Sequence, residues 1–236
     1  MSMVATPRPM TLPVESGHSP GLIPIPGESR IVIRHIGWHV YKCLSEAIGE
    51  GRHVRLAYDG KALEIMVTSY LHEHFKQLLN KVLAAVMLAL GIDHLDGGET
   101  TWDTEESERG LQADLSYYFD REKICVAREA LARQSQNPAD SPSPDLAVEI
   151  DISRPKVDRP SIYARRSVSE VWRFTGVTLV IEQLQGDGSY AVVQASRFIP
   201  VPPAEIVRWL RAEDATLRIA WGRRLQAWAA ALRPQV

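Results

Sequence analysis

Acidic residues recur at alternate positions in the segment of residues 144–172, whose first half reads PDLAVEIDIS. In an extended strand, Asp145, Glu149 and Asp151 share one face, and apolar side chains from Leu146 onward share the other. Carboxylates that face the same way repel one another and are costly to bury. A bound cation would remove both costs, so the pattern favours a metal site on this strand.

Two further acidic residues are candidates for the same site. Asp114 opens the run DLSYYF, which is typical of a short strand, and Glu73 lies on the polar side of a helix predicted at residues 70–90. Mg²⁺ prefers oxygen ligands from carboxylates, water and phosphate. Such an ion can support phosphodiester hydrolysis by activating a water and stabilising the leaving oxygen. For each carboxylate taken singly, a solvated or salt-bridged side chain is the alternative, and Glu149 is the strongest candidate because its strand is otherwise apolar.

Basic side chains follow the acidic strand directly. They are Arg154, Lys156, Arg159, Arg165 and Arg166. Such a patch suits contact with a phosphate backbone. A solvated helix face paired with nearby acidic residues is the alternative interpretation.

Histidines and tryptophans are expected to have other roles. His72 and His74 are two positions apart, so on a helix they point in different directions and make a poor chelating pair. Capping or surface roles are expected for both. Tryptophans stand in apolar patterns and are expected in the core or at an interface; they are Trp172, Trp209, Trp221 and Trp228.

Helices and strands must alternate to position these residues. Helices are predicted at residues 38–48, 70–90, 157–167 and 202–210, and from residue 214 onward. Apolar spacing supports the helix at residues 70–90, and Gly91 is suited to end it. Asp158 stands near the start of the next helix, where an acidic side chain can cap free backbone N–H groups.

Strands are predicted at residues 54–58, 62–67, 114–119, 145–152, 170–174, 177–184 and 189–196. Asp59-Gly60 between the first two is typical of a type I′ hairpin turn. Glycine-containing loops between the last three favour an antiparallel meander. Because hairpins and helices are interspersed, we expect an α/β fold with a mixed sheet rather than a purely parallel one.

Residues 1–29 are rich in Pro, Gly and Ser, so a flexible Pro-rich arm is expected there. Residues 97–113 and 132–144 are expected to be irregular. Residues 30–236 are long enough for a single domain with its own core and C-terminal helices.

Composition limits the class of protein. The net charge of −2 gives no overall basic signature, so contact with nucleic acid would depend on local patches. Cys43 and Cys125 are too few for a disulfide framework or a cysteine-rich zinc site. No apolar run of the sequence reaches the roughly 18 residues that a membrane span needs, and prolines interrupt the N-terminal region where a secretory signal would lie. A cytoplasmic protein that makes no contact with a membrane is therefore expected.

The runs PDLAVEIDIS and DRPSIYARRSVSEVWRF resemble the signature of a large bacterial family of restriction endonucleases of the Uma-two type. In that family a PDL-V-E strand precedes a helix with a basic residue and a tyrosine. VRLAYDGKALEIM, TSYLHEHFKQLL and RGLQADLSYYF are similar to further family segments in the same order, so the resemblance covers residues 35–230. It implies the fold of PD-(D/E)xK nucleases, a restriction-endonuclease-like mixed central β-sheet flanked by helices.

The resemblance also implies a metal site. Matched position by position, the first aspartate of the family falls on Asp114, the strand glutamate on Glu149 and the helix glutamate on Glu73. The basic residue four positions before the helix tyrosine falls on Arg159, and that tyrosine is Tyr163.

Two positions depart from the family pattern. Ala113 replaces the proline before the first aspartate, which affects only the entry to the strand. Arg159 stands where many relatives have lysine; arginine stays protonated and cannot act as a general base, but it can hold a phosphate. Lys156 is close in sequence and is an alternative candidate for the role of the family's lysine. Asp145 belongs to the second PD motif and is expected to open the strand rather than bind metal.

The leading hypothesis is a Mg²⁺- or Mn²⁺-dependent endonuclease that acts on DNA. Glu73, Asp114 and Glu149 would hold the ion, and Arg159 would contact the scissile phosphate. A homodimer is expected, because cleavage of both strands with one site per chain suits a two-fold axis. The alternative is a catalytically inactive module of the same fold that binds nucleic acid or another protein. A phosphatase or nucleotide hydrolase is less favoured because the sequence has no P-loop pattern.

Overall fold

The computed structural model describes residues 28–49, 53–99, 101–104, 108–135, 140–215 and 217–233. The predicted arm therefore lies outside the described residues, apart from its last two. Glu28 is buried, and Ser29 begins the first strand, so the folded part begins before residue 30. Among the described helices, none combines the length and the apolar character that a membrane crossing requires.

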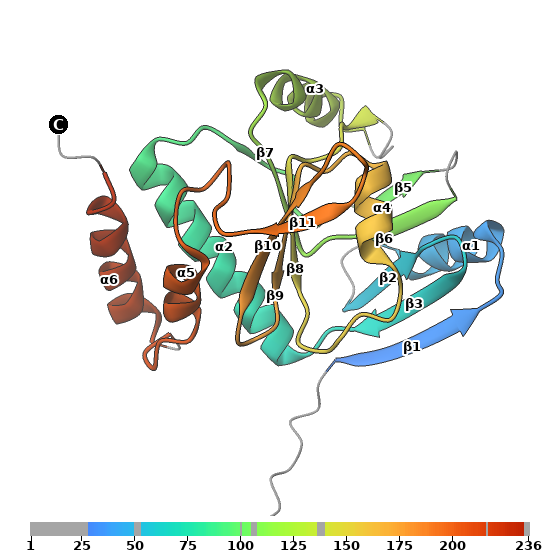
Figure 1. The fold of residues 1–236 in the computed structure, drawn as a ribbon, viewed down its shortest axis with the longest axis horizontal. Coiled ribbons are helices and arrows are strands. Elements are labelled where there is room, and N and C mark those ends of the chain that lie inside the picture. The colour runs from blue at the N-terminus through green and yellow to red at the C-terminus, as the bar shows by residue number, and fades with distance from the viewer. Residues whose placement is uncertain are drawn as a thin grey trace, which may run out of the picture.

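One sheet, on the right in Figure 1, has five antiparallel strands. Their order is β1 (Ser29–Arg34), β3 (Ala62–Val67), β2 (Val54–Tyr58), β6 (Arg109–Gln112) and β5 (Thr101–Thr104). Helix α1 (Trp38–Ile48) packs beside β2, where the rings of Tyr41 and Tyr58 stack at 5.5 Å between centroids. This sheet contributes residues from the N-terminal half of the chain to the candidate site.

The second sheet has six strands and lies at the centre of Figure 1. Their order is β11 (Tyr190–Val193), β10 (Leu179–Leu184), β9 (Glu170–Phe174), β8 (Leu146–Ile150), β7 (Leu115–Tyr118) and β4 (Leu95–Asp96). Only β8 and β9 pair in parallel, so the sheet is mixed. The antiparallel meander of β9, β10 and β11 is confirmed.

The chain passes from one sheet to the other between β6 and β7. Leu111 on β6 pairs with Ala57 of the first sheet, whereas Leu115 on β7 pairs with Val148 of the second. Asp114 lies at this junction, and its backbone N–H donates to Val148 O over 3.1 Å. The change of sheet therefore places one candidate carboxylate between the two halves of the fold.

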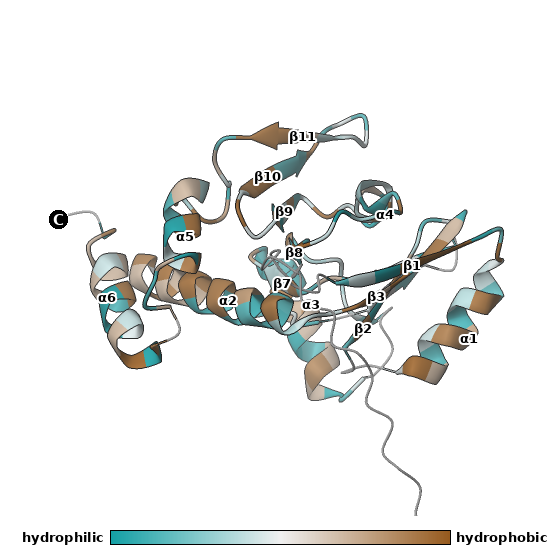
Figure 2. Ribbon diagram, turned by 90° about the horizontal axis from the view of Figure 1, so that it is seen from below, coloured by the Kyte–Doolittle hydropathy of each residue, from teal (hydrophilic) through white to brown (hydrophobic). Residues whose placement is uncertain are grey.

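Helix α2 (Tyr70–Leu90) is the long central helix predicted from the sequence. The Ser69 side chain accepts a hydrogen bond from the His72 N–H at its start, and Gly91 ends it in the left-handed conformation with φ of 67°. Val82 and Val86 are fully buried against the second sheet, and Figure 2 shows α2 as predominantly hydrophobic along its length. Apolar spacing thus determines both the helix and the face that it buries.

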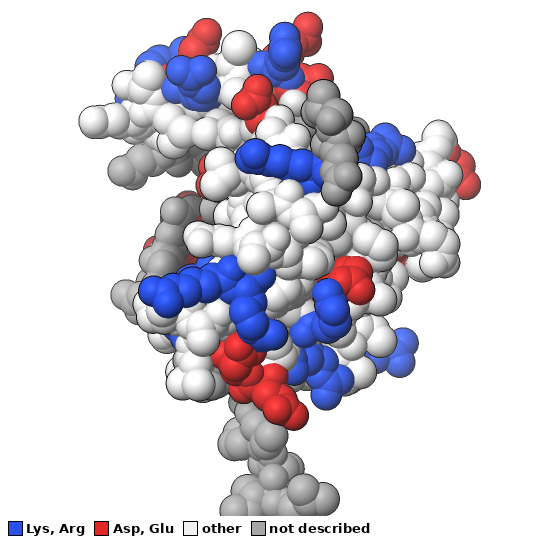
Figure 3. All heavy atoms as spheres, turned by 90° about the vertical axis from the view of Figure 1, so that its left-hand side faces the viewer, with Lys and Arg blue, Asp and Glu red and all other residues white. Residues whose placement is uncertain are grey.

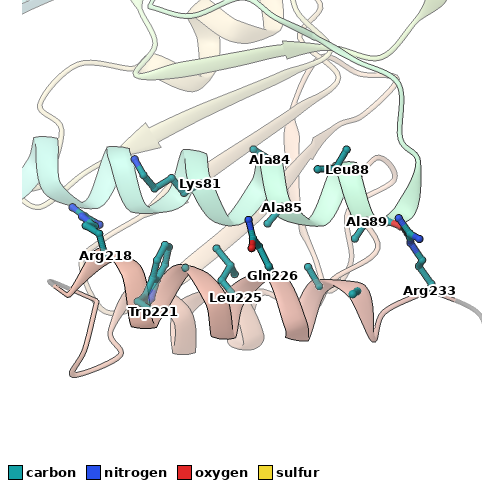
Figure 4. Close-up of a pocket in the computed structure, with 13 residues that line it drawn as sticks. Lys81, Ala84, Ala85, Leu88, Ala89, Arg218, Trp221, Leu225, Gln226 and Arg233 are labelled. Atoms are coloured by element: carbon teal, nitrogen blue, oxygen red, sulfur yellow. Dashed lines mark hydrogen bonds between the residues drawn. The ribbon is translucent and has the colours of Figure 1, made fainter.

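Four further helices surround the sheets. They are α3 (Arg121–Ala132), α4 (Arg159–Arg165), α5 (Pro203–Leu210) and α6 (Arg218–Ala230). Helices α5 and α6 pack against the outer side of α2, away from β1 (Figure 1). Between α2 and α6 lies an apolar groove of about 500 Å³, with Ala84, Ala85 and Leu88 on one wall and Trp221 and Leu225 on the other (Figure 4).

The α/β class and a mixed sheet flanked by helices are confirmed, with local corrections. The turn between β2 and β3 is not type I′, because that type needs positive φ at both central residues. Of the turn residues, Gly60 alone has positive φ, 86°. Residues 97–113 were expected to be irregular but contain β5 and β6, which pair with each other, and β6 also pairs with β2. The last helix begins at Arg218 rather than at Asp214, and α3 was not expected.

Candidate active site

Asp114 immediately precedes β7, and Glu149 lies on β8, the antiparallel neighbour of β7 in the second sheet. Each is only 1% exposed. Asp114 Oδ2 accepts a hydrogen bond of 2.8 Å from the backbone N–H of Ile150, the residue after Glu149. The junction before β7 and the middle of β8 therefore bring together two of the carboxylates expected at the site.

Helix α4 places two side chains on Glu149. Arg159 Nη1 donates to Glu149 Oε2 over 2.8 Å, and the Tyr163 hydroxyl donates to Glu149 Oε1. Arg159 and Tyr163 are four positions apart and share one face of the helix. Asp158 caps the start of α4 by accepting from Ser161 N–H, which directs this face at the strand. The resemblance singled out a strand glutamate, a basic residue and a tyrosine. These residues, Glu149, Arg159 and Tyr163, thus meet in the structure, and Tyr163 contacts Glu149 directly.

Arg159 also bridges further carboxylates. Its Nη2 donates to Glu64 Oε1 over 2.9 Å, and its Nη1 donates to Asp151 Oδ1 over 3.2 Å. Arg30 from β1 reaches the same oxygens, at 2.5 Å from Glu64 Oε1 and 3.2 Å from Asp151 Oδ1. Two arginines and two carboxylates therefore form a buried network around Glu149 that includes two residues, Arg30 and Glu64, that sequence reasoning missed.

His72 is fully buried and joins two carboxylates, so the expected capping or surface role of its side chain is wrong. His72 Nε2 lies 2.9 Å from Asp114 Oδ1, and His72 Nδ1 lies 2.6 Å from Glu28 Oε1. Burial by itself would lower the pKa of His72, but the hydrogen bonds to Asp114 and Glu28 raise it to about 9. The ring is therefore protonated at neutral pH and donates from both nitrogens. A signal was present in the sequence, because position 72 lies seven residues before Leu79 on the buried side of the helix.

Glu73 does not join this cluster directly. Its carboxylate pairs with Lys76 at 2.5 Å, and its side chain is 25% exposed. Among the described residues, no hydrogen bond or ion pair links Glu73 to Asp114 or Glu149. The reason is helical geometry: successive residues are turned by about 100°, so the turn that aims His72 at Asp114 aims Glu73 elsewhere.

Asp145 fits the structural role expected for it. Its Oδ2 accepts hydrogen bonds of 2.8 Å from the backbone N–H groups of Phe119 and Asp120, and its Oδ1 accepts one of 2.6 Å from Lys123. Asp145 therefore ties the start of β8 to the start of α3.

The buried carboxylates have more negative charge than their neighbours neutralise. Burial raises the pKa of Glu149 to about 7; the charges of Asp114 and Asp151 add to the rise, and Arg159 opposes it. Burial likewise raises the pKa of Asp151, whose Oδ2 has no hydrogen-bond partner among the described residues. For Asp114, burial is outweighed by the hydrogen bond from His72, so its pKa is lowered. An added cation would favour the ionised form of Glu149.

Asp114 and Glu149 are the carboxylates of the cluster that could hold a divalent cation. Within the described part of the chain, no group of three or more His, Cys, Asp or Glu side chains is placed to hold a metal. Mg²⁺ nevertheless commonly binds through one or two carboxylates, with water and substrate phosphate completing its ligands. These two carboxylates could supply such ligands, and the raised pKa of Glu149 is what a site that would gain from additional positive charge would have.

The basic residues after β8 divide into two groups. Arg159 is buried among carboxylates, whereas Arg154, Lys156 and Arg165 are exposed. A second basic region covers the C-terminal helices, where Glu205, Glu213 and Asp214 are outnumbered by Arg208, Arg211, Arg218, Arg223, Arg224 and Arg233. Figure 3 views the molecule from that side and shows basic side chains across it, interspersed with acidic ones.

Fold and site define an α/β protein in which strand carboxylates and a helix arginine meet in a buried cluster. The family Uma2, described as "Putative restriction endonuclease", matches residues 38–213. The chain belongs to this family. A comparison with curated proteins finds no match. One similar solved structure is described as "a putative nuclease belonging to DUF820 from Anabaena variabilis ATCC 29413"; it has 11% sequence identity and a TM-score of 0.45, over 75% of this chain and 99% of that chain.

Proposed function

We propose that the protein is a Mg²⁺- or Mn²⁺-dependent endonuclease that hydrolyses phosphodiester bonds of DNA. One observation carries the proposal: Asp114 and Glu149 are both buried, and the charge of Asp114 adds to the burial that raises the pKa of Glu149 to about 7. Burying two carboxylates together is costly unless a cation joins them. Membership of a restriction-endonuclease family supplies the reaction class that such a pair would serve.

Asp114 and Glu149 would hold the ion. When bound, it would supply activation of a water and stabilisation of the leaving oxygen. His72 orients Asp114 Oδ1, and Tyr163 orients Glu149 Oε1, so neither carboxylate is free to rotate. Hydrogen bonds from His72 and Tyr163 thus hold in place the two carboxylates that are proposed to bind the metal.

Arg159 serves as the phosphate contact in this proposal. Its Nε is buried and has no hydrogen-bond partner among the described residues, so the guanidinium has one unused donor, which a shift of the side chain would present to a phosphate oxygen. Glu149, Asp151 and Glu64 raise the pKa of Arg159 further above its high ordinary value. The guanidinium therefore offsets negative charge on the phosphate and does not transfer a proton.

The test is cleavage of plasmid, linear duplex and single-stranded DNA with Mg²⁺ or Mn²⁺. We expect Glu149→Gln to lower the rate at least about 100-fold, as loss of a metal ligand or transition-state contact does. Glu122→Gln, on the exposed side of α3, is the matched control and should cleave like the unaltered protein. Equal cleavage by the unaltered protein and Glu149→Gln would identify a contaminating nuclease and reject the proposal.

A catalytically inactive module that binds nucleic acid or protein is the second candidate. One observation favours it: all four oxygens of Asp114 and Glu149 already accept hydrogen bonds from this chain. Calorimetric titration with Mg²⁺ or Mn²⁺ separates the two candidates. Binding that disappears in Glu149→Gln supports the nuclease, whereas no binding at millimolar metal supports the module.

DNA is the proposed partner, and a homodimer is the proposed assembly. The exposed arginines of α5 and α6 suit contact with phosphates. Two copies related by a two-fold axis would present one site to each strand of a duplex. Light scattering after size-exclusion chromatography measures the assembly, and a monomer mass would reject the dimer. We also propose a cytoplasmic location, which fractionation of the producing cells would test.

A further inference from the structure

Among the described strands, β1 is the longest of those that form the edges of the two sheets. It has six residues, whereas β5, β11 and β4 have four, four and two. Within the same part of the chain β1 pairs with β3 alone, so the backbone N–H and C=O groups on its other side have no partner strand. β1 forms the lower edge of the first sheet in Figure 1. An open edge of this length is a template for pairing with a further strand.

The centre of β1 lacks the features that usually protect an edge. Ile31, Val32 and Ile33 follow one another without a charge or a proline between them. Ile31 is 61% exposed and Ile33 is 38% exposed, on the face of the sheet where Val67 of β3 is 45% exposed. The hydrophobic cluster under α1 buries Leu63, the cross-strand partner of Ile33, but leaves the isoleucines of β1 open. Apolar side chains therefore remain uncovered along an edge that is itself unpaired.

The stretch Arg30–Arg34 reads the same in both directions, Arg-Ile-Val-Ile-Arg. It extends to the end of β1, because His35 leaves the extended conformation with φ of 59°. Two antiparallel copies of such a stretch are self-complementary about an axis at its middle residue. With Val32 opposite Val32 of a second copy, Ile31 lies opposite Ile33, so the exposed isoleucines of both copies meet on one face. The symmetry of the stretch therefore indicates a second copy of this chain as the partner.

Arginines stand opposite each other at the ends of this pairing, with Arg30 of one copy facing Arg34 of the other. Three carboxylates already neutralise Arg30. They are Glu28 at 2.8 Å, Glu64 at 2.5 Å and Asp151 at 3.2 Å. The Arg30 side chain is only 4% exposed, whereas Arg34 is exposed. Arg34 of the second copy therefore meets a group whose charge is balanced, which reduces the usual repulsion between like charges across two strands.

We propose that two copies of this chain pair antiparallel along β1 about a two-fold axis at Val32, so that their first sheets join into one continuous sheet. The pairing supplies backbone hydrogen bonds on the free side of β1 and covers Ile31 and Ile33 with their equivalents. Arg30 connects this interface to the carboxylate cluster, because its guanidinium bonds to Asp151. This inference rests on the homodimer of the proposed function, but not on its nuclease activity.

The test is sedimentation equilibrium of Ile31→Lys beside the unaltered protein. We expect the unaltered protein to form dimers at about 100 µM, and Ile31→Lys to raise the dissociation constant at least about tenfold, because a lysine then lies opposite an isoleucine at two equivalent places. Val192→Lys is the matched control, because Val192 is 64% exposed on β11, an edge of the other sheet. It should keep the dissociation constant of the unaltered protein. A monomer mass for the unaltered protein, or a dissociation constant unchanged by Ile31→Lys, would overturn the proposal.

Ile31→Lys combined with Ile33→Glu tests the register and separates loss of pairing from loss of folding. In the proposed register, the introduced lysine of each copy lies opposite the introduced glutamate of the other. The dissociation constant should therefore return to within about threefold of the unaltered value, although Ile33→Glu alone should weaken the dimer as Ile31→Lys does. Pairing of Ile31 with Ile31 would instead place like charges opposite each other. A double variant that stays monomeric while its circular dichroism shows a folded protein would overturn the pairing about Val32.

Assembly and cleavage fail separately in these experiments. A dimer that persists in Ile31→Lys would reject this interface and keep the proposed homodimer. Glu149-dependent cleavage of DNA by a protein that is monomeric would keep the proposed nuclease and reject this interface. A dimer that Ile31→Lys dissociates, in a protein that does not cleave DNA, would support the interface and reject the nuclease.

Discussion

His72 Nε2 donates a hydrogen bond of 2.9 Å to Asp114 Oδ1, and this contact ties the first turn of α2 to the junction of the two sheets. The other ring nitrogen of His72 is held by Glu28, which precedes β1. A protonated imidazole between two carboxylates neutralises part of a charge cluster that would otherwise be costly to bury. The residue of α2 that contacts Asp114 is thus the protonated His72. The family resemblance suggested that the neighbouring residue, Glu73, would lie at this site.

Replacement of His72 should therefore destabilise the fold strongly. We expect His72→Ala to lower the free energy of unfolding by about 3–5 kcal/mol, because it leaves Glu28 and Asp114 buried without their shared donor. His74→Ala is the matched control two positions away and should change it by less than about 1 kcal/mol. Urea denaturation measures both. A loss in His72→Ala no larger than that in His74→Ala would contradict the importance of the contact.

Low pH should reveal how much the ionised Glu28 side chain contributes to the free energy of unfolding. Burial by itself would raise the pKa of Glu28, but hydrogen bonds from His72 and Ser153 lower it to about 2 from 4.5. A lowered pKa contributes stability above the unfolded value, and that contribution disappears as the pH falls from 4.5 towards 2. The unaltered protein should therefore exceed Glu28→Gln in stability by up to about 3 kcal/mol at pH 6, and the difference should shrink below pH 4.5. Denaturant titrations across this range measure it; a difference that is constant with pH would contradict the assignment.

The placement of Glu73 predicts an unequal effect of two similar substitutions. Glu73→Gln should leave DNA cleavage within about twofold, because the partly exposed Glu73 side chain pairs with Lys76 and not with Asp114 or Glu149. Glu149→Gln should abolish cleavage under the same conditions. Initial rates at saturating Mg²⁺ measure both. Equal losses would show that Glu73 is a metal ligand when substrate is bound.

Arg159 is expected to tolerate lysine better than alanine. Arg159→Ala removes the arginine that pairs with Glu149 and leaves Glu64 and Asp151 with Arg30 alone. We expect a loss of about 3–5 kcal/mol in the free energy of unfolding. Arg159→Lys keeps the charge but not the fork of donors, so a loss of about 1–2 kcal/mol is expected. Arg165→Ala on the exposed side of α4 is the control and should change stability by about 0.5 kcal/mol or less. Thermal and urea unfolding measure the series. Equal effects of alanine and lysine would show that the charge of Arg159 does not stabilise the cluster.

Local pattern was sufficient for several parts of the fold. The apolar stripe and caps predicted α2 from Tyr70 to Leu90, and Asp158 marked the start of α4. The hairpin of β2 and β3 was also predicted, because glycine at the turn and alternating side chains are short-range signals. β5 and β6 were missed, since β6 pairs with β2, more than forty positions away, and β5 joins the sheet by pairing with β6.

The sequence by itself determined the candidates on adjacent elements: Glu149 on its apolar strand, Arg159 and Tyr163 at helical spacing, and Asp114 at the start of a strand. Tertiary structure alone decided what surrounds them. Glu28, Arg30 and Glu64 come from the N-terminal half of the chain, and they meet Asp151, Ser153 and Arg159 only when the two sheets pack. The rotation of α2 about its axis likewise decided that His72, and not Glu73, contacts Asp114. The physical reason is that periodicity depends on near neighbours in sequence, whereas the neutralisation of buried charge depends on neighbours in space.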